Sequence, residues 1–351
     1  MGTDDDRVLP RPLALLVALV ASVLVALSCL PANADPEPPP ATSPTSAAPD
    51  TADATAADPA PRDAAPPDAA PAPAAPPAAA ALTVTGRSAD GWVVYRLADD
   101  RLPSRLLLGL GFRGEVHFVH DGRARAVRVL VPPSAPRPAP LLLALHGMYQ
   151  TPKLTEDVQR WGPLVRREGV VLVYGMGTSA SWNAGTCCGR AVQEGVDDVG
   201  YLDAVRRLVD ALAPLDPRRQ YLTGFSNGAM MAYRYACERP GVVAGVLAVA
   251  GTVTASCTGR ADVAVLHVHG VADRTVPLEG LRYSAALRTP LRPVSRTATM
   301  FGPTITARLL PRYGHGWPTR ARGGFATTEA GWAWLEAHPR RAAAATGQPA
   351  G

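Results

Sequence analysis

Lysine is nearly absent from this 351-residue chain, in which Lys153 is the only lysine and aromatic residues make up 6%. The formal net charge of +5 therefore comes from arginines scattered along the sequence. They are not gathered into basic runs interleaved with aromatic residues, the pattern that single-stranded nucleic-acid-binding surfaces typically carry. The composition gives no support for a nucleic-acid partner, and we expect none.

Long apolar runs are also scarce, because the sequence has only one, at residues 13–30. Two arginines precede it and an Ala-x-Ala motif ending at Ala34 follows it, which is the pattern of a signal peptide. We expect residues 1–34 to be a signal peptide cleaved after Ala34, so that the protein is secreted. Two alternatives stay open: an uncleaved membrane anchor, for which the run is long enough, and a lipoprotein modified at Cys29, which follows a weak lipobox. Without a second such run, we expect no stable membrane insertion after cleavage.

Residues 35–81 lack aromatic side chains and almost all branched aliphatic ones. Such a segment cannot bury enough apolar surface to offset the entropy of ordering it, so we predict a disordered Pro/Ala-rich linker. Every Trp, Tyr and Phe falls within residues 82–341. That stretch of about 260 residues suits a single large core, and we expect one catalytic domain there, followed by a disordered tail at residues 342–351.

Cysteine is rare, and four of the five cysteines remain if Cys29 leaves with the signal peptide: Cys187, Cys188, Cys237 and Cys257. An even number in an exported chain favours disulfide bonds. Three pairings are possible, including one between the adjacent Cys187 and Cys188, and the spacing does not choose among them. A zinc site is the alternative, but the sequence has neither a C-x-x-C pair nor a histidine beside these cysteines. We therefore expect no metal and no cofactor.

Strand-like and helix-like segments alternate through the rest of the sequence. The opening pair, residues 115–120 and 126–131, flanks an Asp-Gly hairpin signal. Further strands are expected at residues 140–145, 169–174, 220–223, 243–249, 263–269 and 304–311, and helices at residues 154–168, 196–212, 229–239 and 328–338, on the basis of apolar runs and helical spacing. This order predicts an α/β fold, with one doubly wound, mostly parallel sheet that has antiparallel strands at its N-terminal side. Ligands of such sheets bind beyond the carboxyl ends of the strands.

A G-x-S-x-G motif at residues 224–228 stands between a predicted strand and a predicted helix. This is the pattern of a nucleophile elbow, in which small residues let the chain turn sharply and expose the serine hydroxyl. A serine hydroxyl is a weak nucleophile unless a base removes its proton, so Ser226 requires a histidine and a carboxylate from other strand ends. The alternative interpretation is a glycine-rich turn with a structural serine.

In this fold the order along the chain is Ser, then Asp or Glu, then His. Of the histidines after Ser226, we expect His267 to be packed within a strand and His338 to be exposed. His315 lies between two glycines in the loop after the last strand and is the predicted base, with His269 as a rival. Asp273, in the loop after the strand at residues 263–269, is the predicted carboxylate.

The oxyanion that forms during acyl transfer needs backbone N–H donors. By the general arrangement of this fold they come from the residue after the nucleophile, Asn227, and from the loop after the third strand, at Met148. Gly147 would let the backbone approach the oxyanion. We expect His146 to be a hydrogen-bonding structural residue and not a second base.

Together these residues resemble the secreted esterases of the polyhydroxybutyrate depolymerase and feruloyl esterase family, which has the α/β-hydrolase fold. The resemblance spans about residues 114–338 and is carried by six strings: L-H-G-x-x-Q at 145–150, S-W-N-A-G-x-C-C-G at 181–189, V-D-D-V-G-Y-L at 196–202, G-F-S-N-G-A-M-M-A-Y at 224–233, H-G-x-x-D-x-x-V-P at 269–277 and G-H-G-W-P at 314–318. It implies Ser226, Asp273 and His315 as the catalytic triad.

The same resemblance implies that Trp182 and Trp317 border the acyl pocket, and that the adjacent cysteines take part in disulfides. Core packing is the alternative role for each tryptophan. One residue departs from the family: Met148 stands where many members carry Cys, which keeps a backbone donor but alters the pocket wall.

The function predicted from these patterns is hydrolysis of carboxylic esters through an acyl-enzyme, on a small or oligomeric ester substrate. Candidates are 3-hydroxybutyrate oligomers and feruloyl or acetyl esters of sugars, among which the residues do not choose. Two other functions are a serine peptidase of the same fold and a non-catalytic secreted binding protein on a hydrolase scaffold. The sequence does not determine the oligomeric state.

Overall fold

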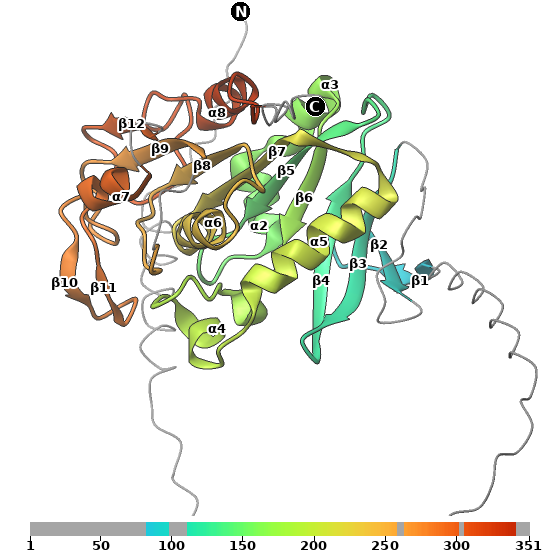
Figure 1. Ribbon diagram of the computed structural model, residues 1–351, viewed down its shortest axis with the longest axis horizontal. Coiled ribbons are helices and arrows are strands. Elements are labelled where there is room, and N and C mark those ends of the chain that lie inside the picture. The colour runs from blue at the N-terminus through green and yellow to red at the C-terminus, as the bar shows by residue number, and fades with distance from the viewer. Residues whose placement is uncertain (1–81, 98–110, 258–262, 302–304, 342–351) are drawn as a thin grey trace, which may run out of the picture. The chain divides into compact units, whose positions relative to one another are not determined.

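The computed structural model describes residues 82–97, 111–257, 263–301 and 305–341 (Figure 1). The predicted signal peptide, linker and C-terminal tail lie outside the described residues. Among the residues described, no helix is long and apolar enough to cross a membrane.

Ten strands form one sheet within the described part of the chain, in the order β1-β2-β3-β4-β6-β5-β7-β8-β9-β12. Their bounds are β1 (Leu82–Arg87), β2 (Val93–Leu97), β3 (Arg113–His120), β4 (Arg123–Leu130), β5 (Ala139–Leu145), β6 (Val171–Gly175), β7 (Leu215–Phe225), β8 (Gly245–Val249), β9 (Ala264–Gly270) and β12 (Ile305–Leu310). All neighbours from β6 to β12 are parallel, whereas β1–β2, β3–β4 and β4–β6 are antiparallel and β2–β3 is parallel. This confirms the predicted doubly wound, mostly parallel sheet with antiparallel N-terminal strands.

Helices cover both faces of the sheet (Figure 1). Their bounds are α2 (Pro152–Gln159), α3 (Trp161–Glu168), the 3-10 turn η1 (Thr178–Ala180), α4 (Gly189–Gln193), α5 (Asp198–Leu212), α6 (Asn227–Glu238), α7 (Val294–Phe301) and α8 (Thr327–Glu336). One apolar cluster packs α5 and α6 on one face, and a second packs α3 and α8 on the other. In β5, alternate side chains divide between them: Leu141, Leu143 and Leu145 join the first cluster, and Leu142 and Ala144 the second.

The predicted helix over residues 154–168 is two helices, because Arg160 between α2 and α3 has a left-handed backbone with φ 54°. Pro163 has no N–H to donate to the carbonyl of Gln159, and its ring would clash with that carbonyl in a continuous helix. The Gln159 carbonyl instead accepts a hydrogen bond from the Thr328 hydroxyl of α8.

Several elements were not predicted: β1, β2, α4, α7 and the hairpin of β10 (Leu281–Ser284) and β11 (Thr289–Leu291). The residues of β1 and β10 are largely exposed, so neither strand carries the buried apolar run that revealed the central strands. β7 is also longer than predicted, because its first residue, Leu215, already pairs with Ala139 of β5.

The cysteines pair as Cys187 with Cys188 and Cys237 with Cys257. The second bond joins the last turn of α6 to the segment after β8, with the two Cα atoms 5.3 Å apart. Among the described residues, no group of three or more His, Cys, Asp or Glu side chains could hold a metal ion.

Candidate active site

Ser226 occupies a sharp turn between β7 and α6, with φ 53° and ψ −119°, a conformation that costs energy for a residue with a side chain. The two glycines of the motif make room for this turn. A Cβ on Gly224 would lie 2.3 Å from the carbonyl carbon of Gly228, and a Cβ on Gly228 would lie 2.5 Å from the carbonyl oxygens of Leu145 and His146. The tight turn from β7 into α6 therefore requires glycine at 224, and the close approach of α6 to the end of β5 requires glycine at 228.

Three predicted residues meet at the carboxyl ends of the strands. His315 Nε2 lies 3.0 Å from Ser226 Oγ, and His315 Nδ1 lies 2.7 Å from Asp273 Oδ2. Ser226 is buried, and the His315 side chain keeps 19% of its area exposed. The serine hydroxyl, the imidazole and the carboxylate thus form one continuous hydrogen-bonded row.

The loops that carry Asp273 and His315 are packed together because they leave neighbouring parallel strands, in which Gly270 of β9 pairs with Leu310 of β12. The amide of Ala272 donates to the carbonyl of Tyr313 over 2.9 Å. A Cβ on Gly270 would lie only 2.2 Å from that same carbonyl oxygen. This contact fixes the approach of His315 to Asp273.

The Asp273 carboxylate is buried but well supplied with donors. Burial works to raise its pKa, but hydrogen bonds from His269 and His315 outweigh this effect and hold the pKa well below its usual range. The amides of Thr275 and Val276 donate to Oδ1 over 2.8 and 2.9 Å. Asp273 is therefore an anion that accepts the Nδ1 proton of His315 and leaves His315 Nε2 as the nitrogen that faces Ser226.

The predicted oxyanion donors lie just beyond the ends of two neighbouring parallel strands. Leu145 of β5 pairs with Gly224 of β7, and Met148 and Asn227 each follow three residues later. Gly147 directly precedes Met148 in a tight loop: its amide donates to Gln150 Oε1 over 3.0 Å, and a Cβ on it would lie 2.9 Å from Phe225. This geometry explains the glutamine of the L-H-G-x-x-Q string, which holds the loop's own backbone.

His146 has the structural role that the sequence predicted. Its Nε2 accepts the amide proton of Gly177 over 3.0 Å, so its Nδ1 carries the proton and donates to the Gly147 carbonyl over 2.8 Å. Burial lowers the pKa of His146 to about 4, so the ring is neutral near pH 7. His146 fastens the β5–α2 loop to the segment after β6.

The Asn227 side chain makes two hydrogen bonds that were not predicted from the sequence. Its Oδ1 accepts from the amide of Trp182 over 2.7 Å, and its Nδ2 donates to the carbonyl of the same residue over 3.0 Å. Trp182 in turn donates from its indole nitrogen to the His146 carbonyl. These bonds join the strings at residues 181–189 and 224–233. The presence of both strings in one sequence is the signal that could have suggested the contact.

Both tryptophans predicted to contact substrate are largely enclosed: Trp182 is wholly buried and Trp317 is 5% exposed. Trp182 packs against the His146 ring, with centroids 4.9 Å apart, and the indole nitrogen of Trp317 donates to Thr328 Oγ1. The structure places both in core packing, and their contact with an acyl group stays a prediction.

The remaining histidines after Ser226 lie apart from it. His267 is wholly buried and His338 is exposed, as expected. His269, the rival base, is buried with its Nε2 3.3 Å from Asp273 Oδ2. It therefore contacts the same carboxylate oxygen as His315, which the sequence did not reveal.

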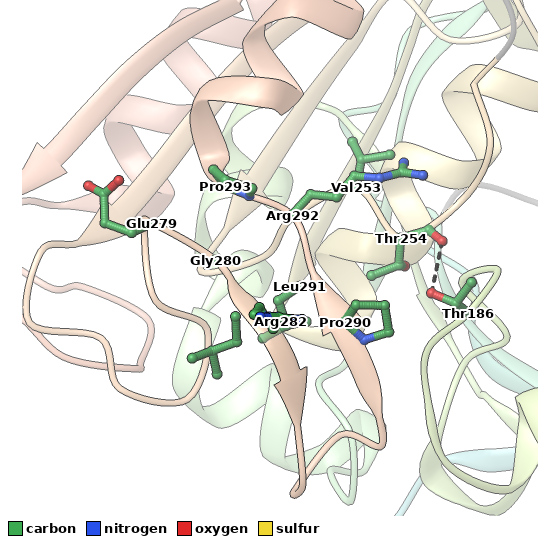
Figure 2. A pocket seen from close by; sticks show the side chains of 11 residues that line it. Thr186, Val253, Thr254, Glu279, Gly280, Arg282, Pro290, Leu291, Arg292 and Pro293 are labelled. Atoms are coloured by element: carbon green, nitrogen blue, oxygen red, sulfur yellow. Dashed lines mark hydrogen bonds between the residues drawn. The ribbon is translucent and has the colours of Figure 1, made fainter.

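A pocket of about 580 Å³ lies between the β10–β11 hairpin and the loops that carry Thr186 and Thr254 (Figure 2). The Thr186 hydroxyl donates to the Thr254 carbonyl over 3.1 Å, the contact dashed in Figure 2. Thr289 of β11 donates to the Thr186 hydroxyl over 2.9 Å, which ties the hairpin to the cysteine-bearing loop. None of the hydrogen-bonded row of Ser226, His315 and Asp273 lines this pocket.

Comparison with known proteins finds similarity to several hydrolases. The sequence profile of the phospholipase/carboxylesterase family matches residues 200–295. NocK of Nocardia uniformis subsp. tsuyamanensis, a protein named as an esterase, is 34% identical over 174 residues, which cover 47% of this chain and 50% of that protein. Feruloyl esterase C of Emericella nidulans is 29% identical over 151 residues, covering 41% of this chain and 52% of that protein.

A third relative is the bifunctional acetylxylan esterase/xylanase XynS20E of Neocallimastix patriciarum, 28% identical over 156 residues that cover 44% of this chain and 22% of that protein. The chain thus spans about half the length, or less, of these curated relatives. Among solved structures, native sOPH superposes with a TM-score of 0.50 at 17% identity, covering 69% of this chain and 92% of that one.

Proposed function

We propose that this chain, which has the α/β-hydrolase fold, is a serine esterase that cleaves carboxylic esters through an acyl-enzyme. The observation that carries the proposal is the continuous row from Ser226 through His315 to Asp273, placed at a strand-to-helix elbow. The match to the phospholipase/carboxylesterase profile and the esterase names of the relatives support the same reaction class.

In the proposed mechanism, His315 Nε2 takes the Ser226 proton as Oγ attacks the ester carbonyl carbon. Asp273 keeps the remaining imidazole proton on Nδ1 and stabilises the imidazolium that forms. The amides of Met148 and Asn227 stabilise the negative oxygen of the tetrahedral intermediate. His315 then gives its proton to the leaving alcohol and later activates the water that hydrolyses the acyl-enzyme.

The proposed substrates are small or oligomeric esters: 3-hydroxybutyrate oligomers, or feruloyl and acetyl esters of sugars. The names of two relatives, a feruloyl esterase and an acetylxylan esterase, favour the latter two. Activity of the purified protein on methyl ferulate, acetylated xylan, polyhydroxybutyrate and p-nitrophenyl acyl esters would rank these classes by kcat/KM.

We also propose that the protein is exported. Residues 1–34 have the pattern of a signal peptide, and the Cys237–Cys257 bond is of a kind that persists in oxidising compartments. N-terminal sequencing of protein from the culture medium tests this, with Asp35 as the expected first residue. Retention of the protein in the membrane fraction would instead support the anchor or the lipoprotein.

Replacement of Ser226 is the decisive test of the activity. Ser226→Ala should abolish turnover of a short-chain p-nitrophenyl ester and labelling by a fluorophosphonate, without loss of the folded state. Ser134→Ala is the matched control, because Ser134 is exposed and its hydroxyl donates to the Arg166 carbonyl, outside the proposed site. Undiminished turnover by folded Ser226→Ala protein would rule out the proposed mechanism.

A further inference from the structure

A row of buried polar contacts leads from Asp273 into the core. His269 Nε2 lies 3.3 Å from Asp273 Oδ2. His267 Nε2 lies 3.0 Å from His269 Nδ1, and the Tyr233 hydroxyl lies 2.6 Å from His267 Nδ1. All three of these side chains are wholly buried. Buried polar groups of this kind are costly unless each one is satisfied, so their protons must be arranged in a defined order.

The acceptors at the Asp273 end determine that order. His269 Nε2 faces the Asp273 carboxylate and, over 2.8 Å, the Val276 carbonyl; both can only accept, so Nε2 carries a proton. An imidazole with its proton on Nε2 accepts at Nδ1, so His269 Nδ1 accepts from His267 Nε2–H over 3.0 Å. Burial lowers the pKa of His267 to about 3, so its Nδ1 accepts from the Tyr233 hydroxyl. Every donor in the row therefore points towards Asp273.

We propose that His269 is a positioning residue for the reaction, and that His267 and Tyr233 hold it in the tautomer whose Nε2–H faces Asp273. This inference rests on the proposed esterase function. Asp273 Oδ1 is held by two backbone amides, but the contacts of Oδ2 are His315 and His269. His315 changes its charge during each turnover, so His269 is the constant donor that keeps Oδ2 facing the imidazole.

The row also connects the two halves of the site through the fold. Tyr233 lies on α6, the helix that begins directly after Ser226, whereas His267 and His269 lie on β9, the strand that leads into the Asp273 loop. The hydrogen bond from Tyr233 to His267 thus ties the helix behind the nucleophile to the strand behind the carboxylate. Positioning of Asp273 is in this way linked to the helix that presents Ser226.

Two replacements at one position separate the donor from the bulk of the ring. His269→Gln keeps an N–H donor near the place of Nε2, whereas His269→Leu removes it. We expect His269→Leu to lower kcat/KM about tenfold, mainly through kcat, as for loss of one hydrogen bond to a charged group. We expect His269→Gln to stay within about threefold of the unmodified protein, and His338→Ala, the exposed control, to match it.

The pH profile gives a readout that simple loss of packing would not change. In the described residues, the titratable groups in contact with Asp273 are His269 and His315. A carboxylate with one donor fewer is more basic and favours a protonated imidazole beside it. The acid limb of the kcat/KM profile should therefore move to higher pH in His269→Leu and stay in place in His269→Gln.

Long-range ¹H–¹⁵N spectra of the histidine rings test the arrangement without any activity measurement. We expect the proton on Nε2 in both His267 and His269 of the unmodified protein, and a mixture of tautomers at His269 in His267→Leu. An unprotonated His269 Nε2 would overturn the inference. So would equal activities and identical acid limbs in folded His269→Leu and His269→Gln while Ser226→Ala is inactive. Turnover by Ser226→Ala would instead overturn the proposed function.

Discussion

Replacement of Asn227 measures how much its hydrogen bonds to Trp182, beside the candidate site, contribute to the free energy of unfolding. Its side chain makes two hydrogen bonds, at 2.7 and 3.0 Å, to the backbone of Trp182, and both residues are wholly buried. Asn227→Ala leaves the N–H of Trp182 without this partner, whereas the Trp182 carbonyl keeps the hydrogen bond from the amide of Cys188. A buried group left unsatisfied costs about 1–3 kcal/mol, so the unfolding free energy should fall by about 1–3 kcal/mol. The melting temperature should fall by roughly 5 °C.

The assay is urea unfolding followed by tryptophan fluorescence, together with fluorophosphonate labelling at low temperature. The replacement keeps the backbone amide of residue 227, so labelling of Ser226 should persist in the fraction that is folded. Gln193→Ala, on the exposed side of α4, is the control and should change the unfolding free energy by no more than about 0.5 kcal/mol. A loss below about 1 kcal/mol in Asn227→Ala would refute the reasoning, because it would mean that the Trp182 backbone does not need this side chain.

Three further outcomes are expected. Asp273→Asn should lower kcat by about 10³- to 10⁴-fold, since an amide can stabilise the wrong tautomer of His315; a stopped assay with a p-nitrophenyl ester measures this. The folded-state pKa of Asp273 lies below its ordinary value of 3.8, so its ionised form adds stability above that pH, which is lost as the pH falls further. The difference in unfolding free energy between the unmodified protein and Asp273→Asn should therefore shrink from pH 6 to pH 3, and a constant difference would contradict the assignment. Cys237→Ser should cost about 3 kcal/mol in the same urea assay, as the closed loop spans 20 residues, and addition of reductant should have no further effect at that bond.

The central part of the fold was predictable because strands that are buried on both faces of the sheet appear in the sequence as continuous apolar runs. The apolar run at residues 140–145 and the elbow at residues 224–228 gave β5, the carboxyl end of β7 and the start of α6 nearly as the structure has them. The break at Arg160 was missed, although Pro163 three residues later could have shown it. The exposed strands β1 and β10 follow no such pattern, because pairing with a neighbouring strand and not burial determines where they lie.

The site was predictable only in part, for a related reason. Motif spacing and chain order predicted that Ser226, Asp273 and His315 meet, since each follows within five residues a strand whose end is fixed by the sheet. The contacts that support them depend on side-chain directions that spacing does not contain. The bond between Asn227 and Trp182 joins residues 45 positions apart, and nothing in the sequence alone pairs Tyr233 with a histidine 34 positions later.

The wide separation of Ser226, Asp273 and His315 along the chain bears on how the protein would acquire the proposed activity. The histidine lies 42 residues after the aspartate and 89 residues after the serine, and it follows β12, the last strand of the sheet. Contacts between such distant segments form slowly, and during synthesis this strand emerges last. A nascent or partly folded chain would therefore carry an unreactive serine until β12 docks beside β9. The rate at which fluorophosphonate labelling appears would then report the final step of folding, and Ser226 would not react with the reagent before that step.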